Sequence, residues 1–145
     1  MTSLRIAVIT SRFNDDVTTR LQEGALKRLQ EKGVAVGAKD IFSVPGAVEI
    51  PVVAQALAKK GGYHAILCLG AVIRGETTHY DYVCQQVSDG CQRVALDTGI
   101  PVIFGILTTE NEEQALDRCG GAHGHKGADC ADAAIEMAVL LNGLK

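Results

Sequence analysis

The stretch Gly70-Ala-Val-Ile-Arg-Gly-Glu-Thr-Thr-His-Tyr-Asp-Tyr-Val83 connects an expected strand to an expected helix through a short polar turn. Its first residues, Gly70 to Val72, are the end of a run from His64 to Val72. This run is nearly continuous in apolar residues, as in a strand covered on both faces. The turn contributes two threonines and His79 directly before a helical pattern. Hydroxyl groups, free helix N–H groups and an imidazole together predict a site for a phosphate-bearing small molecule.

The chain alternates expected strands and helices on both sides of this stretch. Four apolar runs predict strands at residues 5–10, 40–44, 64–72 and 101–108. Helical patterns follow them at residues 15–32, 49–60, 80–98, 109–119 and 128–141. Strand-then-helix units in this order predict a parallel sheet with right-handed crossovers. We therefore expect an α/β fold: one domain over residues 1–145, a three-layer sandwich with helices on both faces of a four-stranded parallel sheet, with flavodoxin-like topology.

Local signals place the ends of these helices. Asn14 or Asp15 can cap the first helix, and Gly33 can end it. The run Thr109-Glu-Asn-Glu112 has the pattern of a capping box for the helix that reaches Cys119. A glycine-rich turn from Gly120 to Gly127 then precedes the last helix. That helix is dense in alanine, which suggests close packing on several sides, either in an oligomer or only on its own sheet.

Composition narrows the class of protein. The chain has 145 residues, of which 47% are hydrophobic and 21% charged, enough for a globular core. A net charge of −3 without clustered Lys or Arg, and 4% aromatic residues, argue against a nucleic-acid partner. No apolar run approaches the roughly 18 to 20 residues that a membrane span needs, and Met1 to Arg5 lacks the apolar region of an export signal. We expect a cytoplasmic protein that does not contact a membrane.

The five cysteines are expected to be buried, reduced thiols. Their number is odd, their spacing is wide, and no C-x-x-C pair occurs: Cys68, Cys84, Cys91, Cys119 and Cys130. They also lie inside the expected strands and helices, so none is expected to act as a nucleophile at the ligand-binding edge of the sheet.

Ligands of such folds bind beyond the carboxyl ends of the strands. Four loops are expected to meet at that edge, at residues 11–14, 45–49, 73–79 and 108–110. His79 taken alone could be an ordinary surface histidine, but its place at this edge after two threonines favours a functional role. Phe13 is either a lid over a planar ligand or a hydrophobic contact at a helix start. Glu49 is either a ligand contact or a favourable acidic residue at a helix N-terminus.

Arg118 and Lys126 flank the glycine-rich turn and are natural phosphate ligands, although both could be solvated charges at helix ends. This turn is not a P-loop, because it follows a helix and carries His125-Lys126 where Gly-Lys is required. The pair His123-x-His125 lacks a third ligand nearby in the sequence, so we expect no metal site. No G-x-S-x-G nucleophile motif is present.

Several motifs resemble those of lumazine synthase, the penultimate enzyme of riboflavin biosynthesis. They occur in the order and spacing of that family, from about residue 5 to the C-terminus. They are Arg12-Phe-Asn14, Val44-Pro-Gly-Ala47 with Glu49-Ile-Pro51, Leu69-Gly-Ala-Val-Ile-Arg-Gly-Glu-Thr-Thr-His-Tyr-Asp-Tyr-Val83, Pro101-Val-Ile-Phe-Gly-Ile-Leu-Thr-Thr109, and Lys126-Gly127 with Ala134-Ile-Glu-Met137. The resemblance implies condensation of 5-amino-6-(D-ribitylamino)uracil with 3,4-dihydroxy-2-butanone 4-phosphate, without metal or organic cofactor. The products would be 6,7-dimethyl-8-ribityllumazine, phosphate and water.

The resemblance also implies a role for each motif residue. His79 would transfer protons. Contacts to the pyrimidine and the ribityl chain would come from Phe13, Asn14, Ala47, Val48, Glu49, Val72, Ile73 and Phe104. Phosphate contacts would come from Glu76, Thr77, Thr78, Arg118 and Lys126. Within the family Phe104, Arg118 and Lys126 belong to the neighbouring subunit, so the resemblance implies a homopentamer that binds small-molecule substrates.

Two departures from the family pattern bear on these expectations. Val48 stands where relatives usually carry an aromatic residue, so stacking on the pyrimidine and binding of riboflavin-like products are expected to be weaker. The chain begins four residues before Arg5, shorter than many relatives, which favours free pentamers. The length of the Gly120 to Gly127 loop is instead compatible with twelve pentamers closing an icosahedron.

Two other functions are compatible with parts of the sequence. A signalling receiver domain would share the layout and the acidic pair Asp15-Asp16, but the third strand ends in Gly70-Ala71 without an aspartate that could be phosphorylated. A non-catalytic relative that binds flavin or lumazine, or that only forms shells, remains the alternative, and Val48 favours it slightly.

Overall fold

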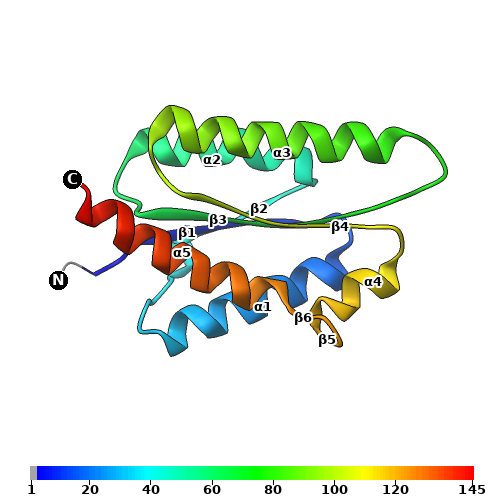
Figure 1. Cartoon of the computed structure of the whole chain (residues 1–145), viewed down its shortest axis with the longest axis horizontal. Helices are drawn as coiled ribbons and strands as arrows, with labels where there is room; N and C mark the ends of the chain where they lie inside the picture. The colour runs from blue at the N-terminus through cyan, green and yellow to red at the C-terminus, as the bar shows by residue number, and fades with distance from the viewer. Residues whose placement is uncertain (1–2) are drawn as a thin grey trace.

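The computed structural model describes residues 3–145 and shows a parallel sheet, in the order β2-β1-β3-β4, between two layers of helices (Figure 1). Met1 and Thr2, which belong to the segment Met1 to Arg5 that lacks the apolar region of an export signal, lie outside the described residues. The α/β fold, the four parallel strands and the helices on both faces are as predicted. Within residues 3–145, no helix has the length and apolar character needed to cross a membrane.

The strands of this sheet are β1 (Ile6–Ser11), β2 (Ile41–Val44), β3 (Ala65–Ile73) and β4 (Val102–Thr109). The α-helices are α1 (Asp15–Glu31), α2 (Ile50–Lys60), α3 (His79–Thr98), α4 (Glu112–Asp117) and α5 (Lys126–Gly143). Two short 3-10 helices, η1 (Ala38–Asp40) and η2 (Ala47–Glu49), precede β2 and α2. A small hairpin, β5 (Cys119–Gly121) and β6 (Gly124–His125), joins α4 to α5.

The hydrophobic core has two halves, one on each face of the sheet. Side chains alternate along a strand, so Leu67 and Leu69 of β3 pack with α1 and α5, while Ile66 and Cys68 pack with α2 and α3. All of β1, and β3 from Ala65 to Val72, are buried. Helices on both faces of the sheet therefore explain why β3 is apolar along its whole length and β1 along most of its length.

Helix α1 illustrates how the sequence pattern builds this core. Its buried apolar residues, Val17, Leu21, Ala25 and Leu29, recur every four positions and so lie on one face of the helix. The helix ends as predicted, because Gly33 adopts a left-handed φ of 83° just beyond Lys32.

Helices α1 and α5 approach each other unusually closely. A Cβ atom added to Gly127 would lie 2.2 Å from the carbonyl oxygen of Leu21, and one added to Gly24 would lie 2.0 Å from the ring of His125. The alanines on the inner face of α5 are buried within this same chain: Ala128, Ala131, Ala134 and Ala138. Packing against α1 and the sheet thus explains this alanine face without an oligomer.

The segment from β4 to α5 differs from the sequence prediction. Asn111, rather than Thr109, caps α4: its side chain accepts a hydrogen bond from the N–H of Gln114 at 2.8 Å. The Thr109 hydroxyl instead donates to the carbonyl of Asn111. Helix α4 ends at Asp117, and the expected glycine-rich turn contains the β5–β6 hairpin. Helix α5 consequently begins at Lys126, two residues earlier than predicted.

All five cysteines are free thiols. Cys68, Cys91 and Cys130 are buried as predicted, but Cys84 and Cys119 are only half-buried. Burial raises the pKa of Cys84, Cys119 and Cys130, because a thiolate is poorly solvated in apolar surroundings.

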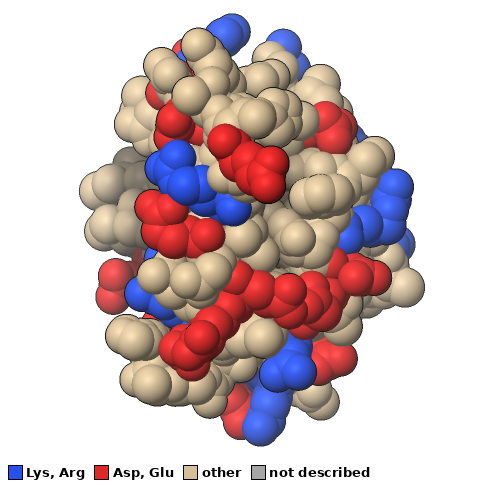
Figure 2. All heavy atoms as spheres, turned by 90° about the vertical axis from the view of Figure 1, so that its right-hand side faces the viewer, with Lys and Arg blue, Asp and Glu red and all other residues tan. Residues whose placement is uncertain are grey.

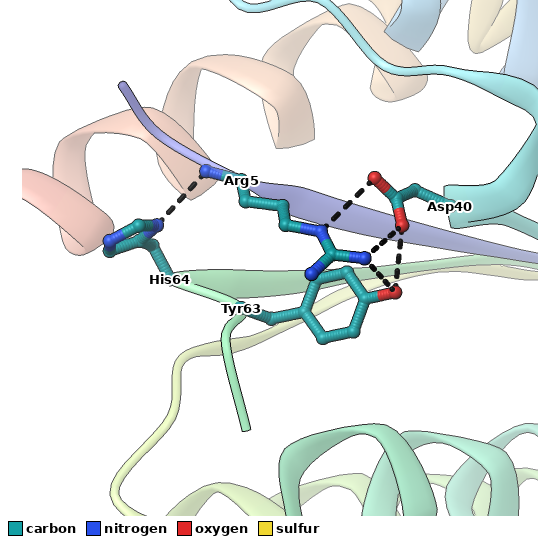
Figure 3. Close-up of polar contacts among 4 residues, drawn as sticks. All are labelled: Arg5, Asp40, Tyr63 and His64. Carbon is teal, nitrogen blue, oxygen red and sulfur yellow. Dashed lines mark hydrogen bonds and ion pairs between the residues drawn. The ribbon is translucent and has the colours of Figure 1, made fainter. Parts of the chain in front are cut away.

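A polar cluster connects the strands at the sheet edge where β1 and β3 begin (Figure 3). The guanidinium of Arg5 pairs with the buried carboxylate of Asp40 at 3.0 Å, and the hydroxyl of Tyr63 donates to the same carboxylate at 2.8 Å. The backbone N–H of Arg5 donates to Nδ1 of His64 at 2.9 Å. The hydrogen bond from Arg5 is the main reason that the pKa of Asp40 lies below its usual value.

We expect Asp40→Asn to destabilise the protein by about 1–3 kcal/mol at pH 7, the range for hydrogen bonds to charged groups. Because folding lowers the pKa of Asp40, its carboxylate stabilises the fold above about pH 4, the unfolded-state value. That stabilisation is lost as the pH falls through the folded-state pKa. Denaturant unfolding of both proteins across this pH range checks the prediction. A stability difference that stays constant from pH 7 to pH 2 would contradict it.

We expect Gly127→Ala to lower the free energy of unfolding by at least about 1–3 kcal/mol, because the new methyl group overlaps the Leu21 carbonyl. Gly143→Ala is the matched control: a Cβ there meets no atom within 4 Å. Thermal or denaturant unfolding of the two variants gives the comparison. Equal stability of both variants would mean that α1 and α5 can separate without cost.

Candidate functional site

A cavity of about 390 Å³ opens beside the carboxyl ends of β1 and β3 and is called the His79 cavity. It has mostly apolar walls and a few polar groups, a composition typical of small-molecule sites. Its lining residues are Phe13, Asn14, Gly46, Ala47, Val48, Ala71, Val72, Ile73, Gly75, Thr77, His79, Tyr80 and Val83. The loops expected at residues 11–14, 45–49 and 73–79 therefore meet here.

The loop after β1 forms one wall. The backbone N–H groups of Arg12 and Phe13 donate to the carbonyls of Val44 and Pro45, which holds this loop beside the end of β2. The Phe13 side chain is 72% exposed and lines the cavity. Exposure of a large aromatic ring fits a ligand-facing role better than a hydrophobic contact at the start of α1.

Asn14 precedes α1 but does not cap it with its side chain. It has a left-handed backbone, with φ 65° and ψ 49°, and its side-chain amide donates to the carbonyl of Ala71 at 3.1 Å. Asn14 therefore occupies the N-cap position, one of the two that the sequence offered, but without a capping hydrogen bond from its side chain. Its amide instead joins the loop to β3 at the cavity.

The segment before α2 forms a second wall. Ala47 and Val48 line the cavity, and Val48 is half-buried. The Glu49 side chain turns back, so that its Oε1 accepts a hydrogen bond from the N–H of Gly46 at 2.8 Å. Glu49 is therefore a local capping residue in this structure and is not among the residues that line the cavity.

The end of β3 forms the floor. The ladder between β1 and β3 ends at the pair Thr10–Leu69, whereas the ladder between β3 and β4 continues to Ile73–Thr109. Strand β3 thus extends past β1 at the cavity. The N–H groups of Ile66 and Arg74 donate to β4 and its flanking residue, so by the alternation along a strand the backbone groups of Ile73 face the β1 side, beyond the ladder, where a ligand can contact them.

His79 is the first residue of α3, and its side chain is exposed at the cavity. Its backbone N–H donates to the hydroxyl of Thr77 at 3.3 Å. Thr78 occupies the N-cap position without a capping bond from its own side chain. Glu76, Thr77 and Thr78 are all exposed, and of these three Thr77 lines the cavity.

Arg118 and Lys126 lie in a second cavity of about 300 Å³, called the Arg118 cavity. The β5–β6 hairpin brings them together, because the N–H of Lys126 donates to the carbonyl of Arg118 at 2.7 Å. The remaining lining residues are Ile106, Leu107, Thr108, Thr109, His123 and Asp129. The two cavities share none of their lining residues. Phe104 lines neither; it is half-buried on β4 and packs with the α2 and α3 core.

Acidic side chains are prominent around this end of the molecule. Figure 2, which views the end that carries α4 and the hairpin, shows a band of Asp and Glu across the middle of that face. The neighbouring Asp16 carboxylate raises the pKa of Glu112. Arg74 is paired with both Glu110 and Asp81, so its charge is already balanced. Arg118 and Lys126 share their cavity with the carboxylate of Asp129.

The structure gives the two histidines of the glycine-rich segment separate positions. His125 caps α5, with its Nδ1 accepting from the N–H of Ala128 at 3.3 Å, while His123 lines the Arg118 cavity. Among residues 3–145, no group of three or more His, Cys, Asp or Glu side chains is arranged to hold a metal ion.

Several cavity residues were missed by the sequence analysis: Gly46, Ala71, Gly75, Tyr80 and Val83. Val83 follows His79 by four positions, so helical periodicity alone would have placed it on the same face. Ala71 and Ile73 are two positions apart on β3 and share a side of that strand. Tyr80 had no such signal, because its contact depends on how α3 lies against β4.

Comparisons with known proteins agree on one family. A family model described as 6,7-dimethyl-8-ribityllumazine synthase matches residues 3–142. Three curated relatives with that same name come from Coxiella burnetii, strains CbuG_Q212, RSA 493 / Nine Mile phase I and Dugway 5J108-111. Each is 54% identical to this chain over 143 residues, which cover 99% of this chain and 95% of the relative.

Proposed function

The chain belongs to the 6,7-dimethyl-8-ribityllumazine synthase family, and we propose that it forms the lumazine in the His79 cavity. The reaction condenses 5-amino-6-(D-ribitylamino)uracil with 3,4-dihydroxy-2-butanone 4-phosphate and releases phosphate and water. The proposed location rests on the mostly apolar cavity itself, which is lined by Phe13 and His79 among other residues. A planar pyrimidine and a small ketone need such a pocket to meet in a productive orientation.

The pyrimidine is proposed to bind between Phe13 and the end of β3. The exposed ring of Phe13 offers an aromatic face for stacking, and the open backbone edge of Ile73 offers hydrogen-bonding groups. Ala47 and Glu49 are proposed to hold the ribityl chain, Val48 to form one wall of the pyrimidine pocket, and Asn14 to fix the loop that carries Phe13. Oε1 of Glu49 accepts from the N–H of Gly46, which leaves its Oε2 to accept from a ribityl hydroxyl.

His79 is proposed to transfer protons. An amine must attack a ketone, water and phosphate must leave, and a ring must close, so protons move in both directions during turnover. An imidazole ordinarily titrates near neutral pH and can both accept and donate a proton there. The presence of His79 among the residues that line the cavity supports this role.

The phosphate is proposed to bind where two subunits meet. Within one chain, Arg118 and Lys126 occupy a cavity separate from that of His79. In the assembly, the Arg118 cavity of a neighbouring subunit would face the His79 cavity. Arg118 and Lys126 of that neighbour would then lie beside Glu76, Thr77 and Thr78 at the N-terminus of α3. The same neighbour is proposed to contribute Phe104.

Exposed apolar side chains support an assembly. Val52 of α2 is 65% exposed, and Tyr82 and Leu96 of α3 are 70% and 73% exposed. Large exposed apolar residues on adjoining helices are typical of surfaces that bind another protein. We propose a homopentamer that uses the α2 and α3 face. Light scattering distinguishes a single pentamer from a particle built of twelve pentamers.

We expect His79→Ala to slow turnover by roughly 10- to 1000-fold with little change in substrate binding, in line with general acid–base contributions. The assay mixes the protein with both substrates and follows the absorbance of the lumazine. Lumazine formation by the variant at the wild-type rate would exclude His79 from the mechanism. A wild-type rate no greater than the spontaneous background would favour a non-catalytic, flavin-binding relative instead.

Two impaired variants, His79→Ala and Arg118→Ala, are expected to recover activity when mixed. His79→Ala retains Arg118, and Arg118→Ala retains His79, so some subunit contacts in a mixed assembly unite both intact halves. Unfolding and refolding an equal mixture should make roughly a quarter of the sites complete, if neighbours pair at random. Refolding each variant alone is the control. A mixture no more active than the two separate variants would show that each site lies within one chain.

A further inference from the structure

Arg74 connects the carboxyl ends of β3 and β4 to the first turn of α3. Its backbone N–H donates to the carbonyl of Thr109 at 2.9 Å, which continues the contact of β3 with β4 by one residue. Its Nε donates to the Glu110 carboxylate at 2.6 Å, and a terminal nitrogen lies 3.4 Å from the Asp81 carboxylate. Its guanidinium also lies over the ring of Tyr80, 4.3 Å from the centroid. We call these contacts the Arg74 bridge.

The Glu110 end of the bridge is itself fixed. The backbone N–H of Glu110 donates to the side-chain carbonyl of Gln114 at 2.8 Å, and the N–H of Gln114 donates to the side chain of Asn111 at 2.8 Å. Glu110 is thus held by the capped start of α4. Through Glu110, Arg74 is connected to structure outside its own loop.

The other end of the bridge reaches the residues next to His79. Tyr80 and Asp81 directly follow His79 in the first turn of α3, and Tyr80 also lines the His79 cavity. Residues 74–79 are exposed, so core packing does not fix this loop. The hydrogen bond from the N–H of His79 to Thr77 is confined to the loop and cannot fix it relative to the sheet.

We propose that Arg74 is a positioning residue that holds the turn carrying His79 in a fixed place relative to the sheet. This inference rests on the proposed function of His79. Arg74 is not among the residues lining either cavity, and two carboxylates already balance its charge. Arg74 contributes through the geometry of its planar guanidinium, which contacts the carboxylates of Glu110 and Asp81 and the ring of Tyr80 at the same time.

The bridge is expected to matter more for turnover than for stability. Exposed ion pairs add little to the free energy of folding, because solvent screens them. Displacing a catalytic group by about 1 Å can nevertheless slow a reaction by up to about 100-fold. A change in kcat without a change in melting temperature would thus separate positioning from a structural role.

We expect Arg74→Ala to lower kcat about 10-fold, with the KM for the uracil substrate and the melting temperature nearly unchanged. Glu110→Gln should give a smaller decrease, and Arg74→Lys should restore part of the rate. Arg28→Ala is the control: Arg28 likewise pairs with two carboxylates, Glu31 and Asp132, and is similarly exposed, but it lies between α1 and α5. This control should keep the wild-type rate.

The decisive measurement repeats Arg74→Ala in a His79→Ala background. If Arg74 acts through His79, the double variant should be no slower than His79→Ala alone. Equal, additive losses in both backgrounds would overturn the inference. A raised KM for the butanone phosphate with unchanged kcat would also overturn it, because Arg74 would then be a phosphate ligand.

Hydrogen exchange supplies a test that does not need turnover. Arg74→Ala should speed amide exchange at residues 75–83 relative to both wild type and Arg28→Ala. Unchanged exchange there would overturn the inference. Wild-type protein that makes no lumazine would instead overturn the proposed function, and the exchange measurement would still decide whether Arg74 holds the turn.

Discussion

The site depends on the unequal lengths of two adjacent parallel strands. Strand β1 pairs with β3 only as far as Leu69, while β4 supports β3 to Ile73. The residues from Gly70 to Ile73 therefore have a single strand neighbour, and the carbonyl of Ala71 accepts a hydrogen bond from the Asn14 amide rather than from a strand. This difference creates the cavity floor with backbone groups that remain rigid because β4 still holds them.

Two kinds of contact then position the loops around that floor. Backbone hydrogen bonds join the Phe13 loop to the end of β2, and the Asn14 amide joins it to β3. The loop that carries His79 is exposed and contains Gly75, so side-chain contacts have to limit its motion.

The sequence predicts the strands well because their signal is local. The run from His64 to Val72 is apolar throughout, and the observed β3 differs from the prediction by one residue at each end. Caps were less predictable, since Asn14, Thr109 and Asn111 can each bond locally in several ways, and tertiary contacts select among them. Residue periodicity could not predict that Arg118 and Lys126 lie in a separate cavity. Their position depends on the β5–β6 hairpin and on the close approach of α5 to α1 at Gly127.

The separation of the His79 and Arg118 cavities has a consequence for how much activity a given amount of protein can show. Under the proposed assembly, each chain gives one half of a site to each of two neighbours. An open row of chains always leaves an unmatched half at either end, whereas a closed ring leaves none. Activity per chain would then depend on protein concentration, and a correctly folded chain would remain inert until its ring closed.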